Sequence, residues 1–194
     1  MQLQPITNGV PSPMGSAMRK ALLLGQEDAA ELWLVRHAEP DRSQADPDAL
    51  SSDPPLSELG IYQAFRLAER VKNSEITAVY SSPYRRTMET ANIIANSCGL
   101  PVTTLADVSE IQLYAHRPPD SIVSVLKQTM AKYRDEIEHA FMETGRWTAF
   151  PFCETGLEFR RRITGAIEEL VRHHLSQRVV LVTHNPVING YLAH

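Results

Sequence analysis

The stretch Leu32-Trp33-Leu34-Val35-Arg36-His37-Ala38-Glu39-Pro40 is a short apolar run that stops abruptly at an arginine and a histidine. A run of this length, bounded by charge and proline, is typical of a buried central strand, although periodicity alone does not separate it from a buried helical turn. We expect a strand over 31–36, which places Arg36 and His37 at its carboxyl end. Ligands bind at that edge in open α/β sheets, so this stretch predicts a site there.

The rest of the chain alternates between strand and helix patterns. Further strands are predicted at 76–81, 101–105 and 178–183. Helices are predicted at 57–72 with Ser57 or Asp53 as the start signal, at 84–97, at 120–143 as one helix or two, at 155–175 with a capping box over Thr155-Gly156-Leu157-Glu158, and after the last strand. This alternation predicts an α/β protein, a three-layer α/β/α sandwich with a mainly parallel central sheet.

Length and composition limit the class of protein. A chain of 194 residues fits one domain, and a net charge of -4 gives no reason to expect nucleic acid or an anionic membrane as a partner. No apolar stretch approaches the ~20 residues that cross a bilayer, and the two cysteines, Cys98 and Cys153, show no disulfide or zinc pattern. We expect a cytoplasmic protein with a flexible N-terminal extension at 1–30, rich in proline, glycine and small polar residues, and one domain at 31–194.

Three of the predicted strands end in residues suited to phosphate chemistry. These ends are Arg36-His37, Ser82-Pro83-Tyr84-Arg85-Arg86 and His184-Asn185. In a parallel sheet they lie on one edge, so two histidines and at least two arginines can converge on one pocket. Arginine donates paired hydrogen bonds to phosphoryl oxygens, and a neutral imidazole can attack phosphorus. Neighbouring arginines disfavour the imidazolium, so we expect His37 to be neutral and nucleophilic at pH 7.

These residues resemble the histidine phosphatase superfamily, the phosphoglycerate mutase-like proteins. The resemblance covers 31–194 and rests on four matches in the family's order, Leu34-Val35-Arg36-His37-Ala38-Glu39, Asp53-Pro54-Pro55-Leu56-Ser57-Glu58-Leu59-Gly60 with Gln63-Ala64, Ser81-Ser82-Pro83-Tyr84-Arg85-Arg86-Thr87 with Thr90-Ala91, and Val182-Thr183-His184-Asn185. It implies a phosphoglycerate mutase-like fold. The chain ends at His194, inside the helix after the last strand, so compared with the family we expect the closing helix and edge strand to be shortened or absent, and truncation of the domain at its C-terminus is left open.

The resemblance assigns a role to each catalytic candidate. It makes His37 the phosphorylated nucleophile, and it makes Arg36, Arg86 and His184 the groups that bind the phosphoryl group. Arg86 is preferred over Arg85 because it stands before Thr87, as in the family, although a mere surface ion pair between Arg86 and Glu89 is the alternative. The family's proton donor is an acidic residue after the third strand, which favours Glu110, with Asp107 as its competitor.

Three further residues are candidates for phosphate or substrate binding: Asn185, Ser43 and Glu154. Glu154 resembles the glutamate of a Gly-Glu-Ser segment in the family, but Cys153 and Thr155 replace its neighbours, so its role stays open. His173-His174 does not predict a metal site, since adjacent helical residues face different ways. We expect no metal and no cofactor.

The sequence thus predicts a phosphomonoester hydrolase that acts through a phosphohistidine intermediate on a small phosphorylated metabolite or a phosphoprotein. Asp41-Arg42-Ser43 stands where the mutases carry a Trp-Asn pair, which favours a phosphatase. Phosphoglycerate mutase-type phosphoryl transfer and a non-catalytic module that binds phosphorylated ligands are the alternatives. The phosphorylated substrate is the expected partner, no nucleic acid or membrane is expected, and a homodimer is left open.

Overall fold

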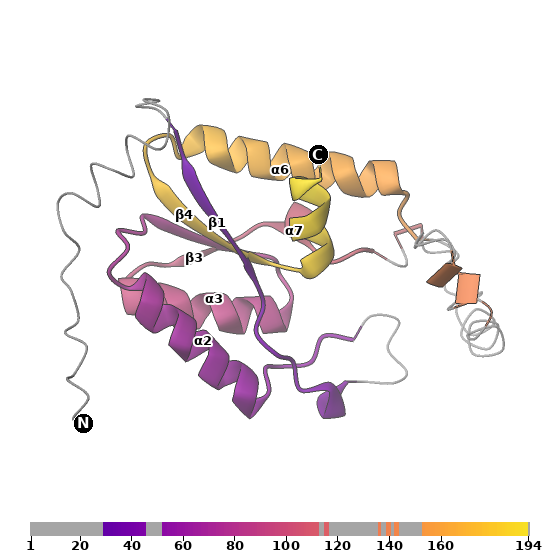
Figure 1. Ribbon diagram of the computed structural model, residues 1–194, viewed down its shortest axis with the longest axis horizontal. Coiled ribbons are helices and arrows are strands. Elements are labelled where there is room, and N and C mark those ends of the chain that lie inside the picture. The colour runs from indigo at the N-terminus through magenta and orange to yellow at the C-terminus, as the bar shows by residue number, and fades with distance from the viewer. Residues whose placement is uncertain are drawn as a thin grey trace, which may run out of the picture.

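The computed structural model describes residues 29–45, 52–112, 115–116, 136, 139–140, 142–143 and 153–193. Within these ranges one sheet holds the strands β1 (Glu31–Arg36), β2 (Ala78–Ser81), β3 (Val102–Thr104) and β4 (Arg178–Thr183). Their spatial order is β1-β4-β2-β3, and every neighbouring pair is parallel (Figure 1). The predicted parallel sheet is confirmed, with β4, the last strand in sequence, inserted between the first two.

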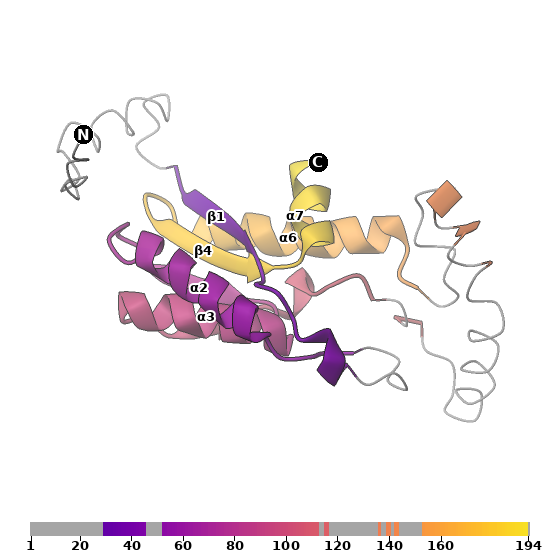
Figure 2. The ribbon, with the colours of Figure 1, turned by 60° about the horizontal axis from the view of Figure 1, so that its bottom comes forward.

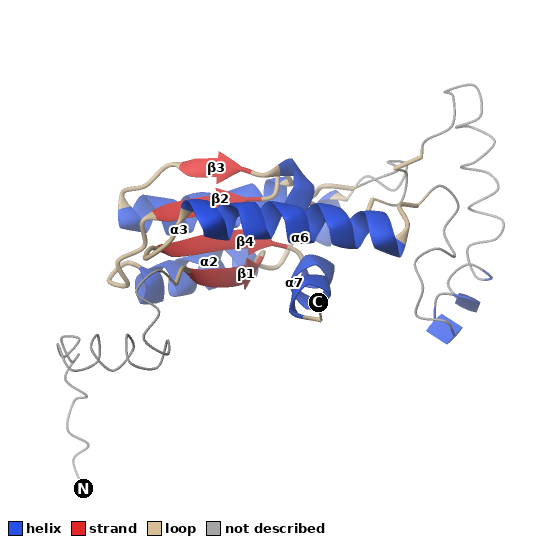
Figure 3. Cartoon of the chain, turned by 90° about the horizontal axis from the view of Figure 1, so that it is seen from above, coloured by secondary structure: helices blue, strands red, loops and turns tan. Residues whose placement is uncertain are grey.

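Helices cover both faces of this sheet. They are α2 (Glu58–Val71), α3 (Arg85–Cys98), α6 (Gly156–His173) and α7 (Asn185–Leu192), with the short 3-10 helices η1 (Arg42–Gln44) and η2 (Ala106–Val108). Helices α2 and α3 lie side by side on one face, and α6 and α7 lie on the other (Figures 2 and 3). The predicted three-layer α/β/α sandwich is therefore confirmed.

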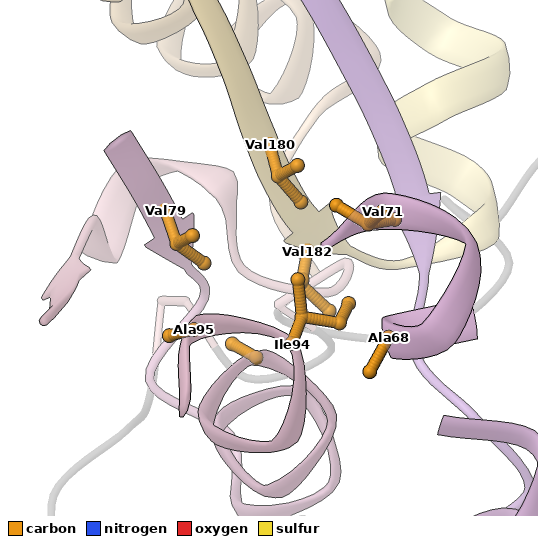
Figure 4. Close-up of a cluster of buried hydrophobic side chains, with 8 residues drawn as sticks. Ala68, Val71, Val79, Ile94, Ala95, Val180 and Val182 are labelled. Carbon is orange, nitrogen blue, oxygen red and sulfur yellow. The ribbon is translucent and has the colours of Figure 1, made fainter. Parts of the chain in front are cut away.

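Strand β4 anchors a separate hydrophobic core on each face, because successive side chains of a strand point to opposite sides. Val180 and Val182 pack with Val79 of β2 and with residues of α2 and α3, among them Val71 and Ile94 (Figure 4). On the other face, the buried cluster consists of Val108, Phe159, Ile163, Ile167, Leu181 and Val187. The four β4 residues from Val179 to Val182 are almost fully buried, as expected for the centre of a parallel sheet.

The helix start signals act as the sequence predicts. Ser57 caps α2, its hydroxyl accepting the Gly60 N–H at 3.0 Å, and Thr155 forms a complete capping box with Glu158 at the start of α6. Helix α3 ends at Gly99, whose φ of 68° is a left-handed conformation that glycine adopts without strain. Observed boundaries differ from the predicted ones by at most two residues; β2, for example, begins at Ala78 rather than at 76.

Several predictions fall outside the described ranges. They are the N-terminal extension apart from 29–30 and most of the predicted helix at 120–143. Among the helices that the structure describes, none combines the length and the apolar character that crossing a membrane requires.

Candidate active site

The three predicted strand ends meet at one edge of the sheet. Arg36 is the register partner of Thr183, and Ser81 is that of Val182. The strand pairing continues past these ends, because the His37 N–H donates to the Thr183 carbonyl at 2.9 Å and the Ser82 N–H donates to the Val182 carbonyl at 3.0 Å. His37, Ser82 and His184 therefore leave three neighbouring strands at the same level.

His37 is held as one neutral tautomer. Its Nδ1 lies 2.7 Å from the carbonyl oxygen of Ala38. A carbonyl only accepts, so Nδ1 carries the hydrogen and Nε2 keeps its lone pair. Burial lowers the pKa of His37 below 6.5; the bond to Ala38 opposes this, while the charges of Arg86, Arg36 and Arg42 lower it further. The unprotonated Nε2 is the nucleophilic atom of this ring.

The backbone after His37 is fixed by close contacts with α2 and α3. The Ala38 N–H donates to the hydroxyl of Thr90 at 3.1 Å, and the Ser57 N–H donates to the Glu39 carbonyl at 3.0 Å. A Cβ on Gly60 would lie only 2.1 Å from the Glu39 carbonyl oxygen. Helix α2 can therefore approach this loop so closely only because residue 60 has no side chain.

His184 is fully buried and both of its ring nitrogens have partners. Nδ1 lies 3.2 Å from Nη2 of Arg86, and Nε2 lies 2.8 Å from the hydroxyl of Ser82. Because a guanidinium only donates, Nδ1 accepts, and the Nε2 hydrogen points to Ser82. Burial first, and then the charge of Arg86, lower the pKa of His184 to about 2. Its ring centroid is 5.5 Å from that of His37.

Arg86 is the arginine of α3 that points into the site. Its side chain is buried, and besides His184 it contacts the carboxylate of Asp53, with Nη1 3.3 Å from Oδ1. Its guanidinium also lies 4.6 Å from the ring centroid of Tyr84. The ion pair with Glu89 is made by exposed Arg85, at 2.7 Å, and not by Arg86.

Glu110 brings a carboxylate to the same place. Its Oε2 lies 3.6 Å from Nδ1 of His184 and 3.8 Å from Nη2 of Arg86. Burial raises the pKa of Glu110, although the Ile111 N–H and the nearby arginines act in the opposite direction. A raised pKa keeps more of this carboxyl protonated, as a proton donor requires. The competing candidate, Asp107, has an exposed side chain on η2.

Arg36 borders the open side of the site. It lines a pocket of about 570 Å³ together with His37, Arg42 and residues of the neighbouring loops, namely Ala38, Glu39, Pro40, Asp41, Ser57 and Gln63. Both Arg36 and Arg42 are exposed. The pocket therefore offers two solvent-facing guanidinium groups beside the nucleophilic ring.

The five predicted catalytic residues thus share one site, whereas the three predicted substrate-binding residues are placed differently. The Ser43 hydroxyl donates to Asp41 at 2.6 Å and lies outside the pocket lining. Asn185 is exposed at the first turn of α7. Glu154 is buried and forms an ion pair with Arg162 at 2.5 Å.

Four residues of this region were not named as site residues from the sequence. Ser82 and Asp53 lie inside the quoted motifs, so their motif positions were the available signal. Arg42 stands in the segment that departs from the mutases. Arg162 had no local signal, because its partners in the loop after β3 lie more than fifty positions away in the sequence.

The described part of the chain contains no group of three histidine, cysteine or acidic side chains that could hold a metal ion. The rings of His173 and His174 face different partners. Nδ1 of His173 contacts the Glu169 carbonyl, and Nε2 of His174 contacts the Tyr80 hydroxyl at 2.8 Å.

Comparison with known proteins identifies a family. The family model described as "Histidine phosphatase superfamily (branch 1)" matches residues 32–194. The probable phosphoglycerate mutase GpmB of Yersinia pestis (strain Pestoides F) is 32% identical over 165 residues, which are 84% of this chain and 73% of the relative.

Solved structures of the same fold include proteins named as a phosphatase and as a phosphoglycerate mutase. A mycobacterial glucosyl-3-phosphoglycerate phosphatase is 25% identical with a TM-score of 0.62, over 82% of this chain and 76% of that one. The same protein has also been solved in complex with VO3. A phosphoglycerate mutase of Bacillus anthracis (strain Sterne) has a TM-score of 0.63 at 18% identity, over 87% of this chain and 81% of that one, and shows the fold alone.

Proposed function

The chain belongs to the histidine phosphatase superfamily, and we propose that it hydrolyses phosphomonoesters through a phosphohistidine formed at His37. The observation that carries this proposal is the orientation of the His37 ring. The Ala38 carbonyl takes the Nδ1 hydrogen at 2.7 Å, which leaves the Nε2 lone pair available near the charges of Arg36 and Arg86. A neutral nucleophile among fixed cations suits attack on a phosphoryl group.

In the first step, Nε2 of His37 forms a bond to phosphorus while the bond from phosphorus to the ester oxygen breaks. Glu110 gives its proton to that oxygen, so the leaving group departs as a neutral alcohol. Arg36 and Arg86 balance the negative charge on the three remaining oxygens. Burial, which raises the pKa of Glu110, favours the protonated carboxyl that this step needs.

In the second step, a water molecule attacks the phosphorus of phospho-His37. The carboxylate of Glu110, now without its proton, takes a proton from this water. The bond between Nε2 and phosphorus breaks, inorganic phosphate leaves, and neutral His37 with protonated Glu110 is restored. The step balances without an external reductant or cofactor.

We propose that His184 becomes protonated when the phosphoryl group binds. In the free site it is neutral, because burial and Arg86 hold its pKa near 2. A phosphoryl anion that contacts both His184 and Arg86 replaces the direct contact between Nδ1 and Nη2, and its negative charge raises this pKa. Protonated Nδ1 then donates to a phosphoryl oxygen, while the Ser82 hydroxyl continues to accept the Nε2 hydrogen.

Hydrolysis is preferred over isomerisation because of the segment Asp41-Arg42-Ser43, which stands where the mutases carry a Trp-Asn pair. The carboxylate of Asp41 accepts hydrogen bonds from the Ser43 N–H, the Ser43 hydroxyl and the Gln44 amide. These bonds stabilise the turn of η1, and Arg42 of this turn lines the pocket. The mycobacterial relative named as a phosphatase supports the same choice.

Phosphoglycerate mutase activity is the second candidate, favoured by the name of the Yersinia pestis relative at 32% identity. A mutase reaction uses the same nucleophile, His37, but transfers the phosphoryl group back to a sugar acid instead of to water. A coupled assay that interconverts the two phosphoglycerates, with and without the bisphosphate, separates the candidates. Isomerisation faster than phosphate release would favour the mutase.

The nucleophile is tested by trapping the phosphoenzyme with an alkaline detergent quench. Wild-type protein mixed with p-nitrophenyl phosphate should carry an acid-labile, base-stable phosphate, and His37→Ala should carry none and release no p-nitrophenol. His173→Ala, at an exposed position on α6, is the matched control. Turnover by His37→Ala at the wild-type rate would refute the mechanism, and vanadate binding without any turnover by the wild-type protein would indicate a binding module.

The substrate is proposed to be a small phosphorylated metabolite or a phosphoprotein, since the open pocket beside His37 presents cationic Arg36 and Arg42. A panel of phosphorylated metabolites and phosphopeptides distinguishes the two classes. A cytoplasmic location and a homodimer stay predictions.

A further inference from the structure

Glu110 lies in a loop outside any helix or strand, so the hydrogen bonds of helices and sheets do not fix its position. After β3 the chain forms only the short turn η2, and Glu110 follows it in an irregular segment. Thr183 supports the turn, its hydroxyl donating to the Val108 carbonyl at 2.6 Å. An acid that must meet a leaving oxygen needs a fixed position, so the contacts that hold residues 107–112 decide whether Glu110 can act.

Arg162 of α6 binds this loop through its backbone. Nη1 donates to the carbonyls of Asp107 and Ser109 at 2.7 and 2.8 Å, and Nη2 donates to the carbonyl of Glu110 at 3.0 Å. One planar guanidinium thereby fixes three carbonyls of the loop, including that of the acid itself. The guanidinium carbon also lies 4.9 Å from the ring centroid of Phe159, in the core of that face.

Glu154 orients Arg162 and holds the other end of the same loop. Its carboxylate accepts from Nε of Arg162 at 2.8 Å and from Nη2 at 2.5 Å. One of its oxygens also accepts the Gln112 N–H at 2.7 Å, and the Glu154 N–H donates to the Gln112 carbonyl at 3.0 Å. The backbone is therefore fixed both before Glu110, by Arg162, and after it, by Glu154.

Every donor of Arg162 is used inside the protein. A guanidinium has five N–H groups, and Nε donates once, to Glu154, while Nη1 and Nη2 donate to three carbonyls and to Glu154. The pair is also largely removed from water, with side-chain exposures of 14% for Arg162 and 4% for Glu154. No donor is left for a phosphoryl group, which distinguishes Arg162 from Arg36 and Arg86.

We propose that Arg162, oriented by Glu154, is a positioning residue that sets the carboxyl group of Glu110 against the leaving-group oxygen. The inference rests on the proposed hydrolysis through phospho-His37. It assigns Glu154 a supporting position behind the acid in place of the substrate contact that the sequence suggested. Lysine cannot replace Arg162, because a single ammonium cannot reach three carbonyls and a carboxylate in one plane.

The leaving group provides a readout that a merely structural role would not change. An alkyl phosphate releases a basic alkoxide and needs the proton of Glu110, whereas p-nitrophenolate leaves without one. Because kcat/KM reports the steps up to phosphorylation of His37, Arg162→Lys should lower it by about 10- to 100-fold for an alkyl phosphate and by less than about threefold for p-nitrophenyl phosphate. The alkaline limb of the pH profile should weaken with the alkyl substrate only.

Two further variants complete the test. Arg161→Lys changes the exposed neighbour on the same helix and should leave both values unchanged. Glu154→Gln keeps an oxygen for the Gln112 N–H but weakens the hold on Arg162, so it should reproduce the selective loss even if Arg162→Lys fails to fold. Circular dichroism and thermal unfolding of each variant report folding.

The outcomes separate this inference from the proposed function. A loss in Arg162→Lys and Glu154→Gln that is equal for both substrates, with phosphohistidine still formed by the wild-type protein, would overturn the positioning role alone. A wild-type protein that forms no phosphohistidine would overturn both. A selective loss with the alkyl phosphate supports the inference.

Discussion

The hydroxyl oxygen of Ser82 lies 2.8 Å from Nε2 of His184, and both side chains are fully buried. Since Nδ1 of His184 accepts from Arg86, the Ser82 hydroxyl is the acceptor for the remaining ring hydrogen. Ser82→Ala should therefore leave a buried N–H without a partner and lower the free energy of unfolding by about 1–3 kcal/mol. Because the ring is also less well oriented, we expect a lower kcat/KM. Steady-state kinetics and urea unfolding on the same samples measure the two effects.

Ser81→Ala is the control for this variant. Ser81 is equally buried and its hydroxyl donates to the Ser82 carbonyl, which also accepts from the Thr87 hydroxyl. Loss of Ser81 thus leaves that carbonyl satisfied, and we expect a smaller loss of about 0.5–1.5 kcal/mol with little change in kcat/KM. Equal loss of kcat/KM in both variants would refute a specific contact between Ser82 and His184.

The pH profile should report two groups with opposite requirements. His37 must be neutral, and its pKa is lowered from 6.5 by burial, so kcat/KM should fall only when the pH drops below that lowered value. Glu110 must be protonated, and its pKa is raised from 4.5 by burial, so kcat/KM for an alkyl phosphate should fall as the pH rises through that raised value. The expected profile for an alkyl phosphate is a bell bounded by these two ionisations.

Glu110→Gln identifies the alkaline limb of this bell. An amide cannot supply the proton, so kcat/KM for an alkyl phosphate should drop by about 10²- to 10⁴-fold and lose that limb. Comparing the two proteins on one substrate cancels the ionisation of the substrate itself. A variant that keeps the wild-type alkaline limb would move the assignment from Glu110 to another acid, with Asp107→Asn as the next variant to measure.

Adjacent arginines on α3 should respond very differently to substitution. Arg86 is buried against His184 and Asp53, so Arg86→Lys should lower kcat/KM by about 10²- to 10³-fold through loss of the planar fork that faces the phosphoryl group. Arg85→Lys affects an exposed pair with Glu89, worth under ~1 kcal/mol, and should change kcat/KM little. Steady-state kinetics of both variants test this. Similar losses in the two would contradict a special role for Arg86.

The sequence predicted the parts of the site that follow directly from local patterns. The ends of β1, β2 and β4 were readable because apolar runs stop sharply there, and parallel pairing then brings Arg36, His37 and His184 to one edge. Helix starts were readable for a similar reason, since a cap at Ser57 depends only on residues within one turn.

Contacts between distant segments were not readable in this way. Nothing near Arg162 indicates that its donors reach carbonyls more than fifty positions earlier, because backbone acceptors carry no residue-type signal. Glu154 shows the same limit. Its sequence context suggested a substrate contact, yet its burial beside Arg162 follows from how α6 packs against the loop after β3.

The close approach of α2 to the nucleophile loop gives a prediction about two glycines. A Cβ at residue 60 would lie 2.1 Å from the backbone oxygen of Glu39, whereas a Cβ at residue 165 would meet no atom within 4 Å. Gly60→Ala should therefore force the helix away from the loop, lower the free energy of unfolding by about 1–3 kcal/mol and reduce kcat/KM, because Glu39 is two residues from His37. Gly165→Ala, inside α6, should raise the free energy of unfolding by about 0.5–1 kcal/mol and leave kcat/KM unchanged, since alanine restricts the unfolded chain more than glycine does. Thermal and urea unfolding measure both, and a Gly60→Ala protein as stable as Gly165→Ala would show that the contact between α2 and Glu39 is looser than the structure has it.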